Sequence, residues 1–317
     1  MKKLVIAALA GVASMSVVVT DVIADWAPAG PIKMMIAFRA GGGADTQARM
    51  IAEEIEARRG WKVIPEQVTG KGGAVLAASL KDQPNDGTVI GIAVTETYGY
   101  NMVSAKKPAY AQSDFTHLTT TAGFQMGIVS LSSKGWNTFP DVIAAAKAGE
   151  SVSFGAMSPK LADLAYMLGQ ANGVEFNIVM VKGGKGVMNG LNAGDLDVGW
   201  GAGIQTKAVK AGDMVNLASG LSTPLSLTPD APLLSDMGVD FNSDGYFLFS
   251  APAGLSDEAR AALADVIQEI VNDPETKVNG LLTKAFGGAI TIGGAQLDAL
   301  MAADEQAAQG LLSAVSE

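Results

Sequence analysis

The stretch that decides the fold is Pro31-Ile32-Lys33-Met34-Met35-Ile36-Ala37-Phe38-Arg39-Ala40-Gly41-Gly42-Gly43-Ala44-Asp45. An apolar run typical of a buried strand ends in three glycines, and residues 45–59 then show the periodicity of a helix. Glycine lets a ligand approach the backbone closely because it has no Cβ. The first N–H groups of a helix lack partners within the helix and carry partial positive charge. The stretch therefore predicts a strand, an anion-binding turn and a helix.

Three later stretches have the same form, an apolar run that breaks at a glycine-rich or Ser-Pro turn before a helix-like segment. They are Val68-Thr69-Gly70-Lys71-Gly72-Gly73-Ala74, Phe154-Gly155-Ala156-Met157-Ser158-Pro159 and Met180-Val181-Lys182-Gly183-Gly184-Lys185-Gly186. Four such turns in one chain predict a cleft that holds a carboxylate or a phosphate.

Strands and helices alternate along the chain, and the pattern occurs twice. The first set has strands at 32–38, 61–65 and 88–94; the second has strands at 151–155, 177–181 and 197–200. Such alternation predicts an α/β fold with mostly parallel sheets covered by helices, here in two lobes. Ligands of open α/β sheets bind outside the carboxyl ends of the strands, where the four turns fall.

The N-terminus is typical of an export signal. Lys2 and Lys3 precede an apolar run at 4–19, and Val22-Ile23-Ala24 offers a small-residue cleavage site. We expect residues 1–24 to be a signal peptide cleaved near Ala24, and the mature protein to be periplasmic. The alternative is a retained anchor, but the run is shorter than the roughly 20 residues that span a bilayer.

The amino-acid composition excludes several classes of function. The chain has no cysteine and one histidine, so thiolate catalysis and cysteine metal sites are excluded. Its net charge of −10 argues against nucleic acid or an anionic membrane as partner. The sequence has no nucleophile elbow, no phosphate-binding P-loop and no His-rich metal pattern. We expect no enzyme activity, no cofactor and no metal.

The chain resembles the tripartite tricarboxylate transporter substrate-binding proteins, the Bug- or TctC-type receptors. The resemblance rests on residues 31–38 with Gly41-Gly42-Gly43-Ala44-Asp45 and Ala48-Arg49, then Gly70-Lys71-Gly72-Gly73 and Asp86-Gly87. Later landmarks are Asp114-Phe115-Thr116, Gly173-Val174, residues 194–198 and Ala251-Pro252-Ala253-Gly254. The chain departs from the family at Arg39, where a small residue or proline is usual, and at 181–186, which lacks a proline and a tyrosine. Ala162-Asp163-Leu164 stands near the place of a usual Ser-His-Leu.

The resemblance implies a two-lobed type II periplasmic-binding-protein fold, a Venus flytrap with two crossovers. It implies a receptor that delivers a small mono- or dicarboxylate to the membrane permease subunits of a tripartite transporter. In the family, the first two glycine loops hold one carboxylate through backbone amides and ordered water. The second lobe then selects the rest of the ligand.

We expect crossovers near residues 122–128 and 243–249. Lobe 1 is then residues 25–124 and 248–317, and lobe 2 is residues 125–247. We expect the receptor to work by hinge closure and to be a monomer. Two alternatives stay open at this point. One is a ligand sensor that signals to a membrane kinase, and the other is an exported α/β hydrolase.

The expected ligand-binding residues come from the four turns and one strand start. They are Arg39, Gly41, Gly42, Gly43, Asp45, Gly70, Gly72, Gly73, Ser158, Lys182, Gly183 and Asp197. Several of these residues have a structural alternative. Asp45 can cap its helix or pair with Arg49, Ser158 suits a helix N-cap, and Asp197 can either orient the cleft or simply terminate a strand. Arg39, Lys182 and Lys185 can point into solvent, or meet a ligand carboxylate.

Overall fold

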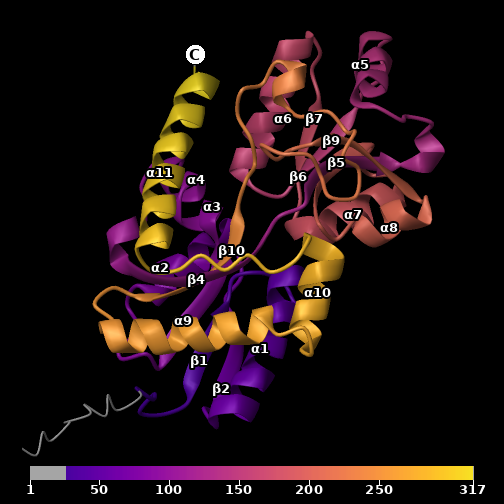
Figure 1. The fold of residues 1–317 in the computed structure, drawn as a ribbon. Helices are drawn as coiled ribbons and strands as arrows, with labels where there is room; N and C mark the ends of the chain where they lie inside the picture. The colour runs from indigo at the N-terminus through magenta and orange to yellow at the C-terminus, as the bar shows by residue number, and fades with distance from the viewer. Residues whose placement is uncertain (1–25, 317) are drawn as a thin grey trace, which may run out of the picture.

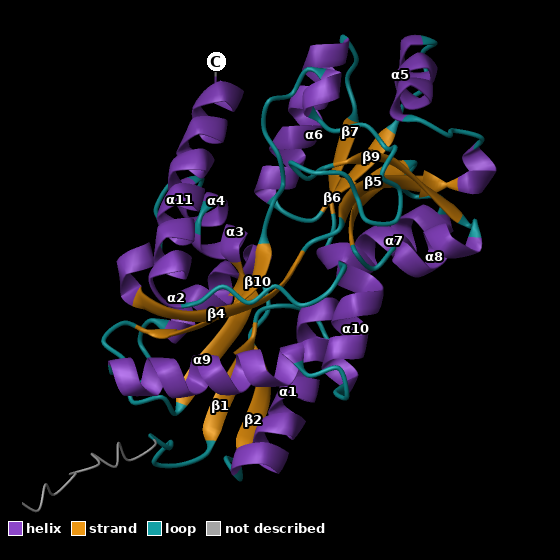
Figure 2. Ribbon diagram, in the orientation of Figure 1, coloured by secondary structure: helices purple, strands orange, loops and turns teal. Residues whose placement is uncertain are grey.

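The computed structural model describes residues 26–316, which form two five-stranded sheets (Figure 1). One sheet has the strand order β2-β1-β3-β10-β4, and the other has the order β7-β6-β8-β5-β9. Helices flank each sheet (Figure 2). The two-lobed α/β architecture predicted from the sequence is therefore present. The predicted signal peptide lies outside the described residues.

Lobe 1 is built on the first sheet. Its strands β1 (Ile32–Ile36), β2 (Val63–Gln67) and β3 (Val89–Val94) are parallel, with β1 in the middle. The strand β10 (Tyr246–Pro252) is antiparallel to β3 and to β4 (Phe115–Gly123). The helices of the lobe are α1 (Gly43–Arg59), α2 (Ala74–Leu80), α3 (Thr95–Tyr98), α4 (Tyr100–Val103), α9 (Asp257–Asn272), α10 (Lys277–Phe286) and α11 (Gly294–Ser316).

Lobe 2 has the same arrangement of strands as lobe 1. Its strands β6 (Ser153–Ala156), β7 (Asn177–Met180) and β8 (Val198–Ala202) are parallel. The strand β5 (Met126–Leu131) is antiparallel to β8 and to β9 (Met214–Ser219). The helices of the lobe are α5 (Phe139–Lys147), α6 (Pro159–Asn172), α7 (Gly183–Ala193) and α8 (Thr206–Ala211).

The chain passes between the sheets twice. It first leaves lobe 1 between the end of β4 at Gly123 and the start of β5 at Met126, and it returns between β9 and β10. The expected boundary at residue 124 falls in the first connection. The expected boundary at residue 247 falls inside β10, whose first residues already pair with lobe 1 strands. The helices α9, α10 and α11 follow the return, so the C-terminal part of the chain packs on lobe 1 (Figure 1).

The central strands are buried on both faces, as expected for a parallel sheet covered by helices. Along β1, Met34 and Ile36 pack in one apolar cluster with Ile51 of α1, whereas Met35 packs in another with Leu76 of α2. All of these side chains are fully buried. The core therefore fixes α1 and α2 on opposite faces, with the turns that precede them at the carboxyl ends of β1 and β2.

Candidate functional site

The first glycine loop, residues 37–42, connects β1 to α1 and is shaped by Asp45. The Gly41 N–H donates to Oδ2 of Asp45 at 2.9 Å, and the Gly42 N–H donates to the Arg39 carbonyl at 3.1 Å. Gly41 has a φ of +73°, in the left-handed region that favours glycine. Asp45 is only 3% exposed. Its carboxylate thus holds the turn from within lobe 1.

Two more side chains occupy the other oxygen of Asp45. The Nε of Arg49 donates to Oδ1 at 2.9 Å, and the Nε2 of Gln67 donates to Oδ1 at 3.2 Å. Gln67 also donates to the carbonyl of Phe38 at 3.2 Å. The protein itself therefore uses both oxygens of Asp45. The structure gives Asp45 the role of positioning the loop, and it gives Gln67 a share in that role which no sequence signal indicated.

The second glycine loop, residues 68–73, connects β2 to α2. Four of its consecutive residues have positive φ: Gly70 (+142°), Lys71 (+48°), Gly72 (+61°) and Gly73 (+97°). Turns of this kind gather neighbouring backbone N–H groups into a concavity that binds anions. Lys71 is the one residue other than glycine with positive φ within residues 26–316. That conformation costs about 1–2 kcal/mol, so the surrounding contacts must impose it.

Two side chains of lobe 1 fasten this second loop. The hydroxyl of Thr97 donates to the Gly72 carbonyl at 2.8 Å, and the Nδ2 of Asn101 donates to the same carbonyl at 3.0 Å. A Cβ on Gly72 would lie 2.6 Å from Nδ2 of Asn101. No larger residue fits there without moving Asn101. Both fastening residues follow β3, on α3 and α4, and were not predicted as part of the site.

Helix α1 begins with unsatisfied backbone donors. Its first internal bond runs from the Thr46 N–H to the Gly42 carbonyl at 2.9 Å, and Gly42 has no side chain with which to cap the helix. The N–H groups of Gly43 and Ala44 consequently have no carbonyl within the helix. The predicted first-lobe residues Gly41, Gly42 and Gly43 thus surround a helix end with free donors, beside the second glycine loop.

Helix α7 of lobe 2 lies against the first glycine loop of lobe 1. A Cβ built on Gly41 would lie 3.9 Å from Nζ of Lys185, which is in the first turn of α7. Lys182 is the N-cap residue of this helix and makes no side-chain capping bond. The first turn of α7 therefore approaches Gly41 of the other lobe through Lys185. That Lys182 and Gly183 contact a ligand there stays a prediction.

The two glycine loops and the start of α7 carry four exposed cations, Arg39, Lys71, Lys182 and Lys185. Within residues 26–316, none of the four forms an ion pair with a carboxylate. Arg39 thus has no carboxylate partner on the described part of the protein. Unpaired positive charge gathered on a chain of net charge −10 favours a small anion at this place.

Ser158 lies at the boundary between the lobes. Its hydroxyl accepts the Leu161 N–H at 3.3 Å and so caps α6, and the residue is 6% exposed. It also contacts Glu96 of α3, which is 8% exposed. Burial raises the pKa of Glu96, while Lys160 and the Ser158 hydroxyl oppose the rise. The buried Oε1 of Glu96 has no hydrogen-bond partner among the described residues.

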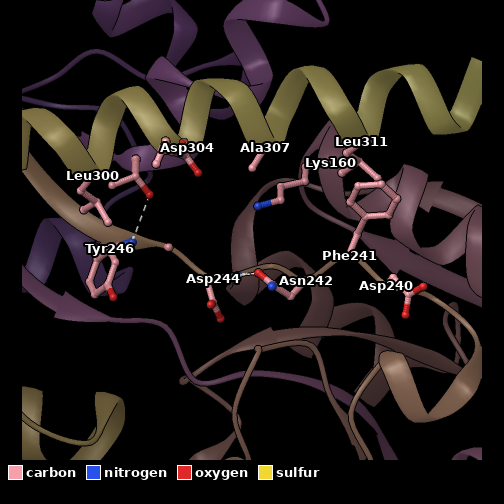
Figure 3. A pocket seen from close by; sticks show the side chains of 13 residues that line it. Lys160, Asp240, Phe241, Asn242, Asp244, Tyr246, Leu300, Asp304, Ala307 and Leu311 are labelled. Atoms are coloured by element: carbon pink, nitrogen blue, oxygen red, sulfur yellow. Dashed lines mark hydrogen bonds between the residues drawn. The ribbon is translucent and has the colours of Figure 1, made fainter.

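A pocket of about 350 Å³ lies between α11 and the segment 240–246, on the side of the molecule where Lys160 emerges from α6 (Figure 3). Lys160 and Asp304 of α11 both line it. Burial raises the pKa of Asp304, and Lys160 opposes that rise too. No residue of either glycine loop lines the pocket. It is therefore a feature of the contact between α11, α6 and the return crossover, separate from the two loops.

The structure places Asp197 away from the other predicted residues. Asp197 precedes β8, and its Oδ2 accepts the N–H of Ser153 at 2.8 Å and the hydroxyl of Ser153 at 2.7 Å. It also pairs with Lys134. Ser153 is the first residue of β6, so Asp197 lies at the amino ends of the parallel strands. The glycine turns follow the carboxyl ends of the strands. Asp197 therefore connects the starts of two strands and does not lie with the glycine turns.

Residues 26–316 contain no group of three or more His, Asp and Glu side chains placed to hold a metal ion. In the same range, no helix has the length and apolar character needed to cross a membrane.

Comparison with known proteins gives a family match over most of the chain. Residues 47–313 match the family described as the tripartite tricarboxylate transporter family receptor. A UPF0065 protein from the TAR-I ttuE–ttuC′ intergenic region of Agrobacterium vitis is 27% identical over 257 residues, which is 78% of this chain and 73% of that protein.

Two solved structures from Rhodopseudomonas palustris have the same fold. Rpa4515, solved with adipate, has a TM-score of 0.79 and 19% identity, over 91% of this chain and 98% of that one. MatC, solved with bound malate, has a TM-score of 0.74 and 18% identity, over 91% and 98% of the two chains. The two-lobed periplasmic-binding-protein fold expected from the sequence is thereby confirmed.

Proposed function

The chain belongs to the tripartite tricarboxylate transporter family of receptors, and from this premise we propose that it is a periplasmic receptor for a small organic carboxylate. It captures the acid between its lobes and delivers it to the membrane permease subunits of a tripartite transporter. The signal-like N-terminus supports export. The bound adipate and malate of two proteins with the same fold support a carboxylate as ligand.

The observation that carries this proposal is the pair of fastened glycine loops. One is held by Asp45, and the other is held by Thr97 and Asn101 through the Gly72 carbonyl. Loops held in this way keep backbone N–H groups in place before a ligand arrives, which lowers the entropic cost of binding. Backbone donors with nearby unpaired cations are suited to a carboxylate.

Closure of the lobes is the proposed mechanism. An acid docks on the loops of lobe 1, and lobe 2 brings α7 over it. Closing removes water from the charged groups, which strengthens each remaining hydrogen bond. The permease then recognises the closed form. Saturating ligand should reduce the radius of gyration with little change in secondary structure, because hinge motions move lobes as rigid bodies.

The direct test is a thermal-shift screen of the mature protein with adipate, malate, citrate and hexanoate, followed by calorimetry on each acid that raises the melting temperature. A ligand at 100 times its Kd stabilises the folded protein by about 2.7 kcal/mol. We expect at least one mono- or dicarboxylate of this panel to bind. A panel of acids that leaves both the melting temperature and the calorimetric heat unchanged would contradict the proposal.

The site itself is tested by Gly72→Ala with Gly60→Ala as a matched control. Both glycines have φ near +65°, at +61° and +69°, so both variants carry the same backbone strain. A Cβ on Gly60 has nothing within 4 Å, whereas one on Gly72 meets Asn101. We expect Gly72→Ala to weaken binding of the best acid at least tenfold, and Gly60→Ala to bind like the wild type. Equal affinity for the two variants would place the ligand elsewhere.

A further inference from the structure

Glu96 is a buried acid at the contact between the lobes. It lies on α3 of lobe 1, directly after β3, and it is 8% exposed. Its carboxyl group contacts the hydroxyl of Ser158, which caps α6 of lobe 2. No hydrogen-bond partner within residues 26–316 reaches Oε1 of Glu96. This arrangement of the lobes therefore removes a carboxyl oxygen from water without giving it a donor from the described part of the chain.

The charged and titratable groups around Glu96 come from three other helices. They are Tyr100 of α4, Lys160 of α6 and Asp304 of α11. Lys160 favours the ionised form of Glu96, and Asp304 disfavours it. Within residues 26–316, no ion pair joins Lys160 to either carboxylate. Burial raises the pKa of Tyr100, so its hydroxyl, which donates to Asp163, keeps its proton near neutral pH.

Only part of this environment moves with lobe 2. Asp304 packs within lobe 1, because its Oδ2 lies against Gly99, where a Cβ would collide with it. Ser158 and Lys160 belong to lobe 2, and they leave Glu96 when the lobes separate. Separation thus returns the carboxyl group of Glu96 towards water. Burial disfavours the charged form of a carboxyl group, so closure is less favourable when Glu96 is ionised than when it is protonated.

We propose that closure of the lobes takes up a proton at Glu96, so that the receptor closes more readily and binds its ligand more tightly as pH falls. The inference rests on the proposed function for the hinge motion. In the open form, the pKa of Glu96 lies closer to its ordinary value of 4.5, and burial raises this pKa in the closed form. Above both pKa values, closure takes up no proton. Between them it takes up one, and affinity rises at most about tenfold for each pH unit of acidification.

The test measures the protons taken up when a ligand binds. Calorimetry with adipate, malate, citrate and hexanoate is run from pH 6 to pH 8.5, at each pH in two buffers that differ in protonation enthalpy. Glu96→Gln is the test variant, because glutamine resembles the protonated carboxyl group. Glu53→Gln is the matched control, since Glu53 is exposed on α1 and forms no ion pair among the described residues. Subtracting one protein from another cancels the protons of the acid itself.

We expect the wild type and Glu53→Gln to take up a proton on binding, and to bind about threefold to tenfold more tightly at pH 6 than at pH 8.5. Glu96→Gln should lose this uptake and bind with nearly constant affinity. Lys160→Met keeps Glu96 but removes the cation that favours its charge, so its proton uptake should move to higher pH. Equal proton uptake by the wild type and Glu96→Gln, or an unmoved pH range in Lys160→Met, would overturn the proposal.

A measurement without ligand separates this inference from the receptor function. Small-angle scattering of the wild type should give a smaller radius of gyration at pH 6 than at pH 8.5, and Glu96→Gln should give the same radius at both. If the wild type binds none of the four acids, the receptor function fails. The radii then decide the role of Glu96: a wild-type radius that does not change with pH overturns it. If the wild type binds an acid but takes up no more protons than Glu96→Gln, only the role of Glu96 fails.

Discussion

The hydroxyl of Tyr100, on α4 of lobe 1, donates a hydrogen bond to the carboxylate of Asp163, on α6 of lobe 2. Asp163 lies in Ala162-Asp163-Leu164, the segment where the family usually has Ser-His-Leu. The contact joins the two lobes. It is formed in this arrangement of the lobes and is lost if they separate, so it contributes to the equilibrium between open and closed forms.

Tyr100→Phe removes this bond and little else. A hydrogen bond contributes about 1 kcal/mol net, and more when its partner is charged. We expect affinity for the best acid to fall about threefold to tenfold, with a slightly larger radius of gyration in the absence of ligand. Calorimetry and small-angle scattering measure the two effects. Unchanged values of both would mean that the bond does not influence closure.

Burial raises the pKa values of two carboxyl groups, Glu96 and Asp304, and the positive charge of Lys160 opposes both rises. Because the folded state holds their protons more tightly than the unfolded state, their charged forms oppose folding at neutral pH. We expect Lys160→Met to lower the free energy of unfolding by about 1–3 kcal/mol at pH 7.5. The deficit should shrink towards pH 5, as the two carboxyls take up protons.

Urea unfolding of Lys160→Met and the wild type at both pH values measures this effect. Lys207→Met is the control, because Lys207 is not a cause of either pKa shift. A deficit that is the same at pH 7.5 and pH 5 would contradict the link between Lys160 and these carboxyls.

The sequence predicts the strand-turn-helix units well because each depends on local residues. The glycines at 41–43, 70, 72 and 73, the helix α1 and the cap at Ser158 are all indicated by residues within about ten positions. The strand β4 was not predicted, since Thr119, Thr120 and Thr121 interrupt its apolar pattern although all three are fully buried. Their hydroxyls find partners from distant segments: that of Thr121, for example, donates to Gln47 at 2.5 Å.

The residues that hold the site were missed for the same reason. Gln67, Thr97 and Asn101 act through contacts with loops 22 to 29 residues away in sequence. No local pattern marks such partners. For Asp197 the local sequence pattern was misleading. It lies at the amino end of its strand, whereas the glycine turns lie at the carboxyl ends.

His117 should make stability depend on pH. Burial lowers its pKa to about 4, and its Nδ1 lies 2.9 Å from the hydroxyl of Ser250. The unfolded chain, with an ordinary histidine pKa near 6.5, binds a proton at pH 5 that the folded protein excludes. Stability supplied by neutral His117 is thus complete above pH 6.5 and is lost as pH falls towards 4.

Comparison with His117→Gln isolates this effect, because glutamine does not titrate and still offers a polar group to Ser250. Relative to its value at pH 7.5, the wild-type free energy of unfolding should fall about 2 kcal/mol further than that of the variant by pH 5. Parallel pH profiles for the two proteins would show that His117 is protonated in the folded state, or that water reaches it.

Arg39 is the residue by which the first glycine loop departs most from its family. It follows β1 and lies two residues before Gly41, its carbonyl accepts the Gly42 N–H, and its guanidinium has no carboxylate partner within residues 26–316. A guanidinium can grip a carboxylate through two parallel hydrogen bonds, which a lysine cannot do. We therefore propose that Arg39 adds a direct ion pair to the backbone donors of the loop.

Because Arg39 is exposed in this arrangement, solvent screens part of the interaction, and the expected effect is moderate. Arg39→Ala should weaken binding of the best acid about tenfold to a hundredfold, or roughly 1.4–2.8 kcal/mol. Arg39→Lys should recover only part of the loss, since it restores the charge without the two-pronged contact. Lys106→Ala, another exposed cation outside the loops, serves as the control. If Arg39→Ala binds within a few-fold of the wild type, the glycine loops hold the anion without it, and Arg39 is a surface charge.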